Sequence, residues 1–208
     1  MNSNHKAFTL VELLLAIVLT VILLGLLQPT HCRARESARR ANCMSNVRNI
    51  GLAFKQYAVD NNNSFPTIVT SNNGITSTSV FLSLTNGGYL QPGKIYVCPS
   101  DKKKKPFKKT FFSSGSFTEA NNSYACVVAN ATGTNGMTEA ASSDQPLLFD
   151  EGLIGAPGYA INLTNATWSA ASPHKTDGGN IFYVGGHAGW KKRFDTGSDG
   201  TNGFVVVP

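Results

Sequence analysis

Two patterns of apolar residues follow one another in the amino-terminal part of the chain. From Phe8 to Gln28 almost every residue is apolar, and Glu12 is the only charged one. At a rise of about 1.5 Å per residue, a helix of this length crosses the roughly 30 Å hydrocarbon core of a bilayer. The pattern therefore predicts a transmembrane helix over residues 8–28 with one carboxylate inside it.

A different spacing begins after Pro29. Apolar residues now recur three or four positions apart, which is the mark of one buried stripe on an amphipathic helix: Cys43, Val47, Ile50, Phe54 and Tyr57. Pro29 removes a backbone hydrogen bond, so we expect a bend near residues 25–29. The asparagines 61–63 end the pattern. We therefore expect a helical continuation over residues 29–60 that packs onto a globular head.

Residues 61–208 form that head, with no sign of a second domain boundary or of a repeat. Short apolar runs rich in β-branched or aromatic residues alternate with Gly, Asn and Ser, which indicates strands. The predicted strands are Lys94–Cys98, Ser123–Ala129, Pro146–Asp150, Asn180–Val184 and Phe204–Val207. A two-residue turn at Gly185–Gly186 is expected to close a hairpin with residues 187–190. The fold class is α+β, a long amino-terminal helix packed on a small antiparallel sheet.

Glu12 is the residue of the first pattern with the clearest functional meaning. An ionised carboxylate inside a bilayer costs several kcal/mol, about 3 at the helix centre, unless a partner compensates it. Such a residue indicates a functional site by default. The alternative is that Glu12 lies at headgroup depth and reaches water.

The residues around Glu12 carry a specific resemblance. The junction Lys6-Ala7 is followed by Phe8-Thr9-Leu10-Val11-Glu12 and then by the apolar helix. This arrangement resembles the type III signal of type IV pilins and type II secretion pseudopilins. The resemblance implies a leader at residues 1–7, cleavage by prepilin peptidase between Ala7 and Phe8, and methylation of the new amine. Ala7 departs from the family, which usually has Gly there.

The resemblance also implies how the protein works. Cleavage creates an ammonium at Phe8, and Glu12 lies one helical turn away, so the ammonium of a neighbouring subunit could pair with this carboxylate during assembly. The implied partners are prepilin peptidase, identical or related pilin subunits in a filament, an inner-membrane assembly platform and membrane lipid. A retractable pilus and a secretion pseudopilus both remain open, as do major and minor subunit roles.

Two arguments about the orientation of the chain in the membrane disagree. Arg33, Arg35, Arg39 and Arg40 follow the apolar segment, and the positive-inside tendency would keep them in the cytoplasm. The resemblance implies the opposite, a cytoplasmic amino terminus and a translocated head, since the leader must meet its peptidase inside. We give the resemblance precedence, and we assign the arginines to contact with anionic lipid.

Two further segments extend the resemblance toward the carboxyl terminus. The run from Arg35 to Pro66 resembles pilin-like proteins of planctomycete and verrucomicrobial type, which also carry a Cys-Pro-Ser-Asp segment and a late His-x9-Asp-Gly signature. Residues 98–101 match the Cys-Pro-Ser-Asp segment. The late signature matches in part, because the spacing after His174 is one residue longer and Gly185–Gly186 replace Asp-Gly.

The formal net charge of +6 is unevenly distributed. Lys102–Lys105 together with Lys108 and Lys109 form a run that could attract DNA phosphates or anionic polymers without regard to sequence. Few aromatic residues accompany it, namely Phe107, Phe111 and Phe112, so base stacking has little support. A solvated loop is the favoured interpretation, nucleic-acid binding is disfavoured, and a minor pilin-like binding module remains an alternative.

The cysteines lack the close Cys-x-x-Cys spacing of common zinc sites, so the sequence predicts no metal site: Cys32, Cys43, Cys98 and Cys126. In an exported head a disulfide becomes possible. On the buried stripe, Cys43 is a candidate to pair with Cys98 or with Cys126. A free buried thiol is the alternative.

Histidines and acidic loops are the remaining candidates for chemistry. His174, Asp177 and His187, with Asp150 and Glu151 as helpers, would suit a membrane-anchored envelope metalloenzyme, but hydrogen bonding within turns is favoured. The loop 195–200 could offer oxygens to calcium, and a plain turn is favoured there too. We therefore predict a structural subunit that is not an enzyme and has no catalytic or cofactor-binding residues.

Overall fold

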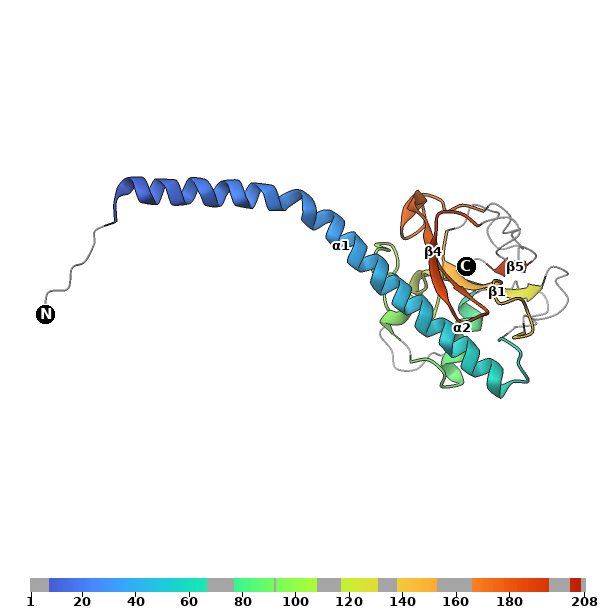
Figure 1. Ribbon diagram of the computed structural model, residues 1–208. Coiled ribbons are helices and arrows are strands. Elements are labelled where there is room, and N and C mark those ends of the chain that lie inside the picture. Colours follow the sequence, from blue (N-terminus) through green and yellow to red (C-terminus); the bar gives the residue numbers. More distant parts are fainter. Residues whose placement is uncertain are drawn as a thin grey trace, which may run out of the picture. The chain divides into compact units, whose positions relative to one another are not determined.

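Figure 1 shows the computed structural model of the chain. The structure describes seven stretches: residues 8–66, 77–91, 93–107, 117–130, 138–152, 166–194 and 203–206. Within these stretches, the side chains of residues 26–33, 128–130 and 203–206 are not described. The chain divides into two compact units, residues 1–38 and residues 39–208. The long helix α1, Leu10–Asp60, contributes to both.

The start of α1 is fixed by a capping box. Thr9 precedes the helix, and its hydroxyl oxygen accepts the Glu12 backbone N–H at 3.3 Å. In return Glu12 Oε2 accepts the backbone N–H and the hydroxyl of Thr9, both at 2.9 Å. The Thr-x-x-Glu spacing thus satisfies free donors at the helix start, because the first turn has no intrahelical acceptors for them. The helix runs on through Pro29, and the predicted bend there stays a prediction.

The second half of α1 carries the predicted buried stripe. Cys43, Val47, Ile50 and Phe54 are fully buried, which confirms the spacing argument. The last predicted member, Tyr57, is only partly buried, and Ala58 takes the buried position. The helix ends at Asp60, where Asn62 and Asn63 take left-handed φ angles of 54° and 58°. Asparagine tolerates this conformation better than most residues.

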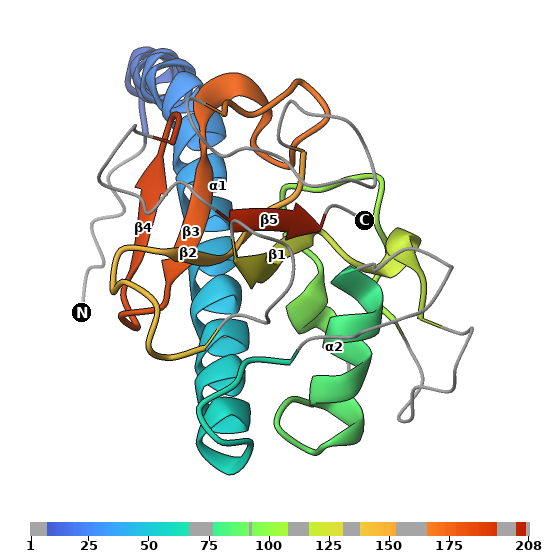
Figure 2. The same cartoon turned by 90° about the vertical axis from the view of Figure 1, so that its right-hand side faces the viewer.

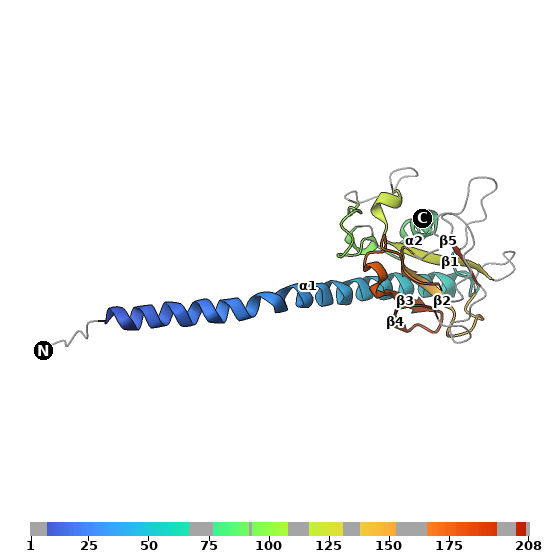
Figure 3. The ribbon, with the colours of Figure 1, turned by 90° about the horizontal axis from the view of Figure 1, so that it is seen from above.

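The stripe packs against an antiparallel sheet of five strands in the order β4-β3-β2-β1-β5. Figures 2 and 3 show the second half of α1 running along the sheet. The strands have these bounds: β1 Tyr124–Asn130, β2 Pro146–Asp150, β3 Gly179–Tyr183, β4 Ala188–Lys191 and β5 Gly203–Val206. The predicted α+β fold class, a long helix on a small antiparallel sheet, is confirmed.

Register decides which strand residues face the helix. Cys126, Leu148 and Phe182 are opposite one another across β1, β2 and β3, so they share one face of the sheet. A Cβ on Gly51 of α1 would lie 2.3 Å from the Phe182 ring, so glycine at this position permits the close approach of helix and sheet. The other face, with Phe149, packs on Phe194, and Trp168 stacks on Phe194 at 5.3 Å.

The predicted hairpin between β3 and β4 is present, but its turn is longer than predicted. The Tyr183 carbonyl accepts the Gly186 N–H at 2.9 Å, and the Tyr183 N–H donates to the His187 carbonyl at 3.0 Å. This pattern belongs to a three-residue loop, residues 184–186, whose last residue has a left-handed conformation. Gly186 meets that need with a φ of 86°.

Two other elements differ from the prediction. Lys94–Cys98 is not a strand, because Lys94–Tyr96 forms a 3-10 turn, η1, that places Tyr96 among Phe81 and Phe117. Helix α2, Ser77–Asn86, was not predicted at all. Its Ser, Thr and Val residues have weak helix propensity, yet Val80, Phe81 and Leu84 form one buried face.

Within the described residues, no helix is both long enough and apolar enough to cross a bilayer. The predicted span over residues 8–28 includes positions 26–28, whose side chains lie outside the description.

Candidate functional site

The first candidate site is the amino-terminal segment of α1. Its large apolar side chains from Leu10 to Leu24 are between 47% and 79% exposed. Glu12 stands at the start of this apolar surface. Both hydrogen bonds that its carboxylate accepts end on Oε2, so among the described residues Oε1 is available to another donor. Phe8, whose amine the predicted cleavage would free, is 74% exposed, and Ala7 lies outside the described residues.

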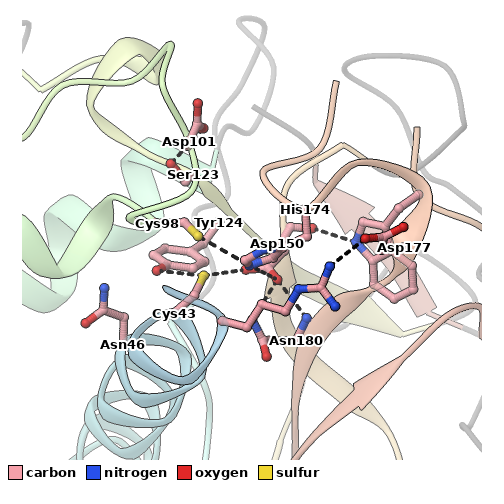
Figure 4. A network of polar contacts seen from close by, with 12 residues as sticks. Cys43, Asn46, Cys98, Asp101, Ser123, Tyr124, Asp150, His174, Asp177 and Asn180 are labelled. Carbon is pink, nitrogen blue, oxygen red and sulfur yellow. Dashed lines mark hydrogen bonds and ion pairs between the residues drawn. The ribbon is translucent and has the colours of Figure 1, made fainter. Parts of the chain in front are cut away.

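The second candidate site is a buried cluster of two thiols, a carboxylate and an imidazole: Cys43, Cys98, Asp150 and His174. One potential ligand atom from each residue lies within 4.8 Å of all the others. Figure 4 shows the four side chains converging from separate elements. Cys43 comes from α1, Cys98 follows η1, Asp150 ends β2, and His174 precedes the 3-10 turn η3, Lys175–Asp177.

Strand alternation places Asp150 on the face of the sheet that is covered by α1. Tyr124 and Asp150 are paired across β1 and β2, two positions beyond the pair Cys126 and Leu148. Asp150 Oδ2 accepts the Asn180 backbone N–H at 2.7 Å and the Asn180 side-chain N–H at 2.9 Å. These two bonds hold a carboxylate that is fully buried, where an unpaired charge would cost several kcal/mol, about 3–5 when a buried partner is removed.

Sulfur contacts complete the cluster. The Cys43 thiol donates to Asp150 Oδ1 at 3.1 Å and lies 3.4 Å from the Tyr124 hydroxyl. Cys98 Sγ lies 3.4 Å from His174 Nε2. His174 Nε2 in turn lies 3.7 Å from Asp150 Oδ2, and both side chains are fully buried.

The ionisation of these groups follows from burial and from their contacts. Burial raises the pKa of Cys43, and contact with Cys98 and the charge of Asp150 act in the same direction. Burial also raises the pKa of Asp150, against His174 and the Asn180 hydrogen bonds. For Cys98, a hydrogen bond from Cys43 lowers the pKa to about 7, although burial opposes it and His174 assists. Since Cys43 has one proton, it donates to Asp150 or to Cys98, never to both at once.

An outer layer closes the cluster on the histidine side. The His174 ring packs edge-on against Trp190 with centroids 5.2 Å apart. The Arg40 guanidinium lies 4.7 Å above the Trp190 ring and forms an ion pair with Asp177 at 2.5 Å. Asp177, one of the sequence candidates, therefore serves as a partner of Arg40 at the rim.

The other predicted candidates are not part of this cluster. His187 is exposed and stacks on Tyr183 at 4.4 Å, so the structure does not bring it together with His174. Cys126 is buried on β1 away from the cluster, and the side chain of Cys32 lies outside the described residues. Cys43, Cys98 and Cys126 are free thiols here. The loop 195–200, the calcium candidate, also lies outside the described residues.

One lysine of the run, Lys104, makes contacts within the head. Lys104 forms an ion pair with Glu151 at 2.9 Å and donates to the Glu119 carbonyl at 2.8 Å. Lys102, Lys103 and Lys105 are exposed, whereas Lys108 and Lys109 lie outside the described residues. Beside this run is a cleft of about 550 Å³, and its lining residues include Asn42 and Asn46 of α1, Lys94, Lys104 and Cys98.

Sequence signals for the buried cluster are weak. Its four members stand at positions 43, 98, 150 and 174, so their spacing matches no short metal-ligand motif. The Cys-Pro-Ser-Asp segment was a usable signal, since Asp101 N–H bonds the Cys98 carbonyl at 2.9 Å and turns the chain at Cys98. A second usable signal was the charged residue that ends the apolar run Pro146–Asp150, because period-2 alternation places Asp150 on the same face as Leu148.

Comparisons with known proteins bear on both sites. Residues 2–27 match the prokaryotic N-terminal methylation motif. Residues 32–89 match a family described as a protein of unknown function, DUF1559. The resemblance to pilin-like proteins is thereby confirmed. No match was found among curated proteins or among solved structures.

The two matches divide the pilin-like features between them. The methylation motif includes Ala7, Phe8 and Glu12, the residues of the predicted cleavage and assembly site. The second match includes the buried stripe of α1 and helix α2, and therefore Cys43. Cys98, Asp150 and His174 lie beyond both matches, so their grouping is known from the structure alone.

Proposed function

We propose that the chain is a structural subunit of a type IV pilus-like or type II secretion pseudopilus filament. Prepilin peptidase removes residues 1–7, residues 8–28 insert in the inner membrane with the head outside, and mature subunits polymerise through their amino-terminal helices. The match to the methylation motif supports the processing step. Assembly would then continue on an inner-membrane platform, in contact with related subunits and lipid.

One observation carries the assembly step. The apolar side chains from Leu10 to Leu24 are at least 47% exposed, and Glu12 stands at their amino-terminal end. Contiguous apolar surface of this kind marks contact with another protein or with a membrane. A carboxylate beside it can fix the register of neighbouring helices if it meets a cation of the next subunit. The ammonium freed at Phe8 is that cation in this proposal.

The test separates the charge of Glu12 from its role in the capping box. Glu12→Val removes both and is expected to abolish filaments while leaving leader cleavage intact. Glu12→Gln keeps a side-chain carbonyl that can accept the Thr9 N–H but removes the charge. We expect it to assemble no better than Glu12→Val. The matched control, Thr9→Val, weakens the cap and keeps the charge, so it should still form filaments.

The measurements are mass spectrometry of the amino terminus and electron microscopy of sheared filaments. Normal filaments from Glu12→Gln would contradict the charge pairing, because only the capping role of Glu12 would then matter. Mature protein that retains residues 1–7 would contradict processing. Loss of filaments in Thr9→Val as well as in Glu12→Gln would show that helix capping, rather than charge, controls assembly.

A further inference from the structure

The buried cluster of Cys43, Cys98, Asp150 and His174 offers the donor atoms of a zinc site. Two thiolate sulfurs, one imidazole nitrogen and one carboxylate oxygen are all ligands that Zn²⁺ accepts. We propose that these four residues bind one zinc ion that fastens the second half of α1 to the sheet. This inference is independent of the filament proposal, since it concerns only residues of the 39–208 unit.

The distances fit a tetrahedral ion after a small contraction. Bonds of about 2.0–2.3 Å to a tetrahedral zinc place neighbouring ligand atoms roughly 3.3–3.8 Å apart. Two contacts are already close to that range: Cys43 Sγ to Asp150 Oδ1 at 3.1 Å and Cys98 Sγ to His174 Nε2 at 3.4 Å. The other carboxylate oxygen, Asp150 Oδ2, lies 3.7 Å from His174 Nε2. The widest separation between potential ligand atoms is within 4.8 Å. Closing it needs side-chain movements of about 1 Å, with no change of fold.

The site is closed, which indicates a structural ion. Cys43, Cys98 and Asp150 are fully buried and His174 is 3% exposed. Four protein ligands complete a tetrahedron, whereas catalytic zinc keeps a position for water or substrate. The ligands come from four elements that are far apart in the chain, so the ion would link α1, the segment after η1, β2 and the segment before η3.

Charge balance favours an ion at this place. Without metal, the buried Asp150 carboxylate lies 3.7 Å from Nε2 of His174, which binds zinc as the neutral imidazole. When Zn²⁺ binds, it replaces the thiol protons of Cys43 and Cys98, and both protons leave to solvent. The two added positive charges equal the two thiolate charges, so the net charge of the cluster does not change. The ion then lies beside the carboxylate that burial would otherwise leave poorly compensated.

Hydrogen bonds from neighbouring residues hold the proposed ligands in place. Asn180 fixes Asp150 through two hydrogen bonds to Oδ2, which leaves Oδ1 directed at Cys43. The Tyr124 hydroxyl lies 3.4 Å from Cys43 Sγ and can donate to a thiolate there. Outer partners of this kind orient metal ligands in known sites. The cleft of about 550 Å³ that reaches Cys98 gives a route from the surface.

A Cys43–Cys98 disulfide would use the same two sulfurs, so it excludes the zinc site. Oxidation would also remove the thiol that donates to Asp150 Oδ1 at 3.1 Å, leaving that buried oxygen without this donor. The two states are therefore alternatives, and the redox state of the isolated protein distinguishes them.

The experiment uses the full chain, isolated in detergent from cell envelopes without chelator. Elemental analysis should find one zinc per chain, and replacement by Co²⁺ should give the intense visible bands of tetrahedral cobalt together with a thiolate charge-transfer band. Removal of the metal should lower the thermal midpoint by roughly 5–10 °C, the shift expected when the ion is present at about a hundred times its dissociation constant.

Matched variants separate ligands from ordinary buried residues. Cys98→Ala should lose the cobalt spectrum, whereas Cys126→Ala, which removes an equally buried thiol outside the cluster, should keep it. Asn180→Ala should weaken zinc binding about 10- to 100-fold without removing a ligand. His174→Cys replaces one zinc ligand by another, so it should bind cobalt and strengthen the thiolate charge-transfer band even if other variants at this position do not fold.

Three results would overturn the proposal. The first is a Cys43–Cys98 disulfide in peptides mapped from the protein as isolated. The second is reduced, folded protein that takes up neither zinc nor cobalt. The third is a folded Cys98→Ala variant that keeps the cobalt spectrum of the wild type, which would show that Cys98 is not a ligand.

Discussion

The two halves of α1 differ in what covers their apolar side chains. Leu14, in the first half, is 54% exposed, whereas Val47, Ile50 and Phe54, in the second half, are fully buried by the chain's own sheet and by α2. In the first half the apolar residues surround the helix, and in the second they form one stripe. The apolar side chains of the first half are therefore open to contact with lipid or another protein, and those of the stripe are covered within the described part of the chain.

The carboxylates of the two regions show the same difference. Glu12 is exposed and satisfied locally by Thr9, three residues before it. Asp150 is fully buried and satisfied by residues far from it in the sequence, Cys43 and Asn180. A substitution at Glu12 should therefore act on assembly, and a substitution around Asp150 should act on the fold.

The largest contrast is expected between two truncations of apolar residues on the same helix. Phe54→Ala empties a buried position whose ring lies 6.2 Å from Phe81 and 6.4 Å from Phe65. Its free energy of unfolding should fall by about 3–5 kcal/mol. Leu14→Ala, on the exposed half, should change it by less than about 0.5 kcal/mol. Denaturant unfolding followed by tryptophan fluorescence measures both.

The assembly assay should reverse the order of these two variants. The Leu14→Ala variant is expected to unfold like the wild type and yet to form fewer filaments. If Leu14→Ala destabilised the head as much as Phe54→Ala, then the first half of α1 would be packed within its own chain, and the comparison would fail.

The second contrast concerns the buried carboxylate. Asn180→Ala removes the side-chain donor that lies 2.9 Å from Asp150 Oδ2 and keeps the backbone donor. A hydrogen bond to a charged group contributes about 1.5–3 kcal/mol, so the free energy of unfolding should fall by that amount. Unfolding is measured with chelator present, which removes any metal contribution. Glu12→Gln is the matched control and should leave head stability unchanged; an equal loss in both variants would contradict the distinction.

An alkaline titration tests the aromatic cluster under α2. Burial raises the pKa of Tyr96 to about 12, against the hydrogen bond with Thr85. Because this folded-state pKa exceeds the unfolded value of 10, unfolded Tyr96 ionises first as pH rises. Its contribution is therefore complete below pH 10 and is lost as pH rises through 12, roughly 2 kcal/mol by pH 12.

Tyr96→Phe isolates this contribution from the other groups that titrate in base. The variant should be less stable at neutral pH, by about 1 kcal/mol for the lost hydrogen bond to Thr85. Between pH 10 and pH 12 its stability should fall less steeply than that of the wild type. Parallel pH profiles for the two proteins would contradict a pKa of Tyr96 that is raised in the folded state.

Local patterns predicted much of this fold, because each confirmed element has a periodicity of its own. The stripe from Cys43 to Phe54 and the strand Pro146–Asp150 are examples. Helix α2 was missed since Val80, Phe81 and Leu84 form a helical face only in a context that overrides the weak propensity of their neighbours. Tyr96 was assigned to a strand, but packing against Phe81 and Phe117 holds it in a 3-10 turn.

The candidate site was less predictable than the fold for a related reason. Glu12 lies in a contiguous motif, residues 2–27, so the sequence alone could predict it as an assembly residue. Cys43, Cys98 and His174 meet only after the sheet has brought distant segments together, and sequence spacing holds no record of that proximity. The prediction that no metal binds assumed that zinc ligands occur in close pairs. Ligands from four separate elements do not meet that assumption, and the zinc proposal therefore replaces it.

The smallest contrast lies in surface charge. Lys104 pairs with Glu151 at 2.9 Å, with side chains 15% and 22% exposed, whereas Lys103 is exposed. Burial raises the pKa of Glu151, and Lys104 opposes this shift. Lys104→Met should therefore cost about 0.5–1 kcal/mol of unfolding free energy, and added salt should reduce the difference from wild type. Lys103→Met, its matched control, should cost less than about 0.5 kcal/mol. Equal, negligible effects in thermal unfolding would mean that the whole lysine run is solvated surface, whereas a loss confined to Lys104→Met would show that one member of the run belongs to the structure of the head.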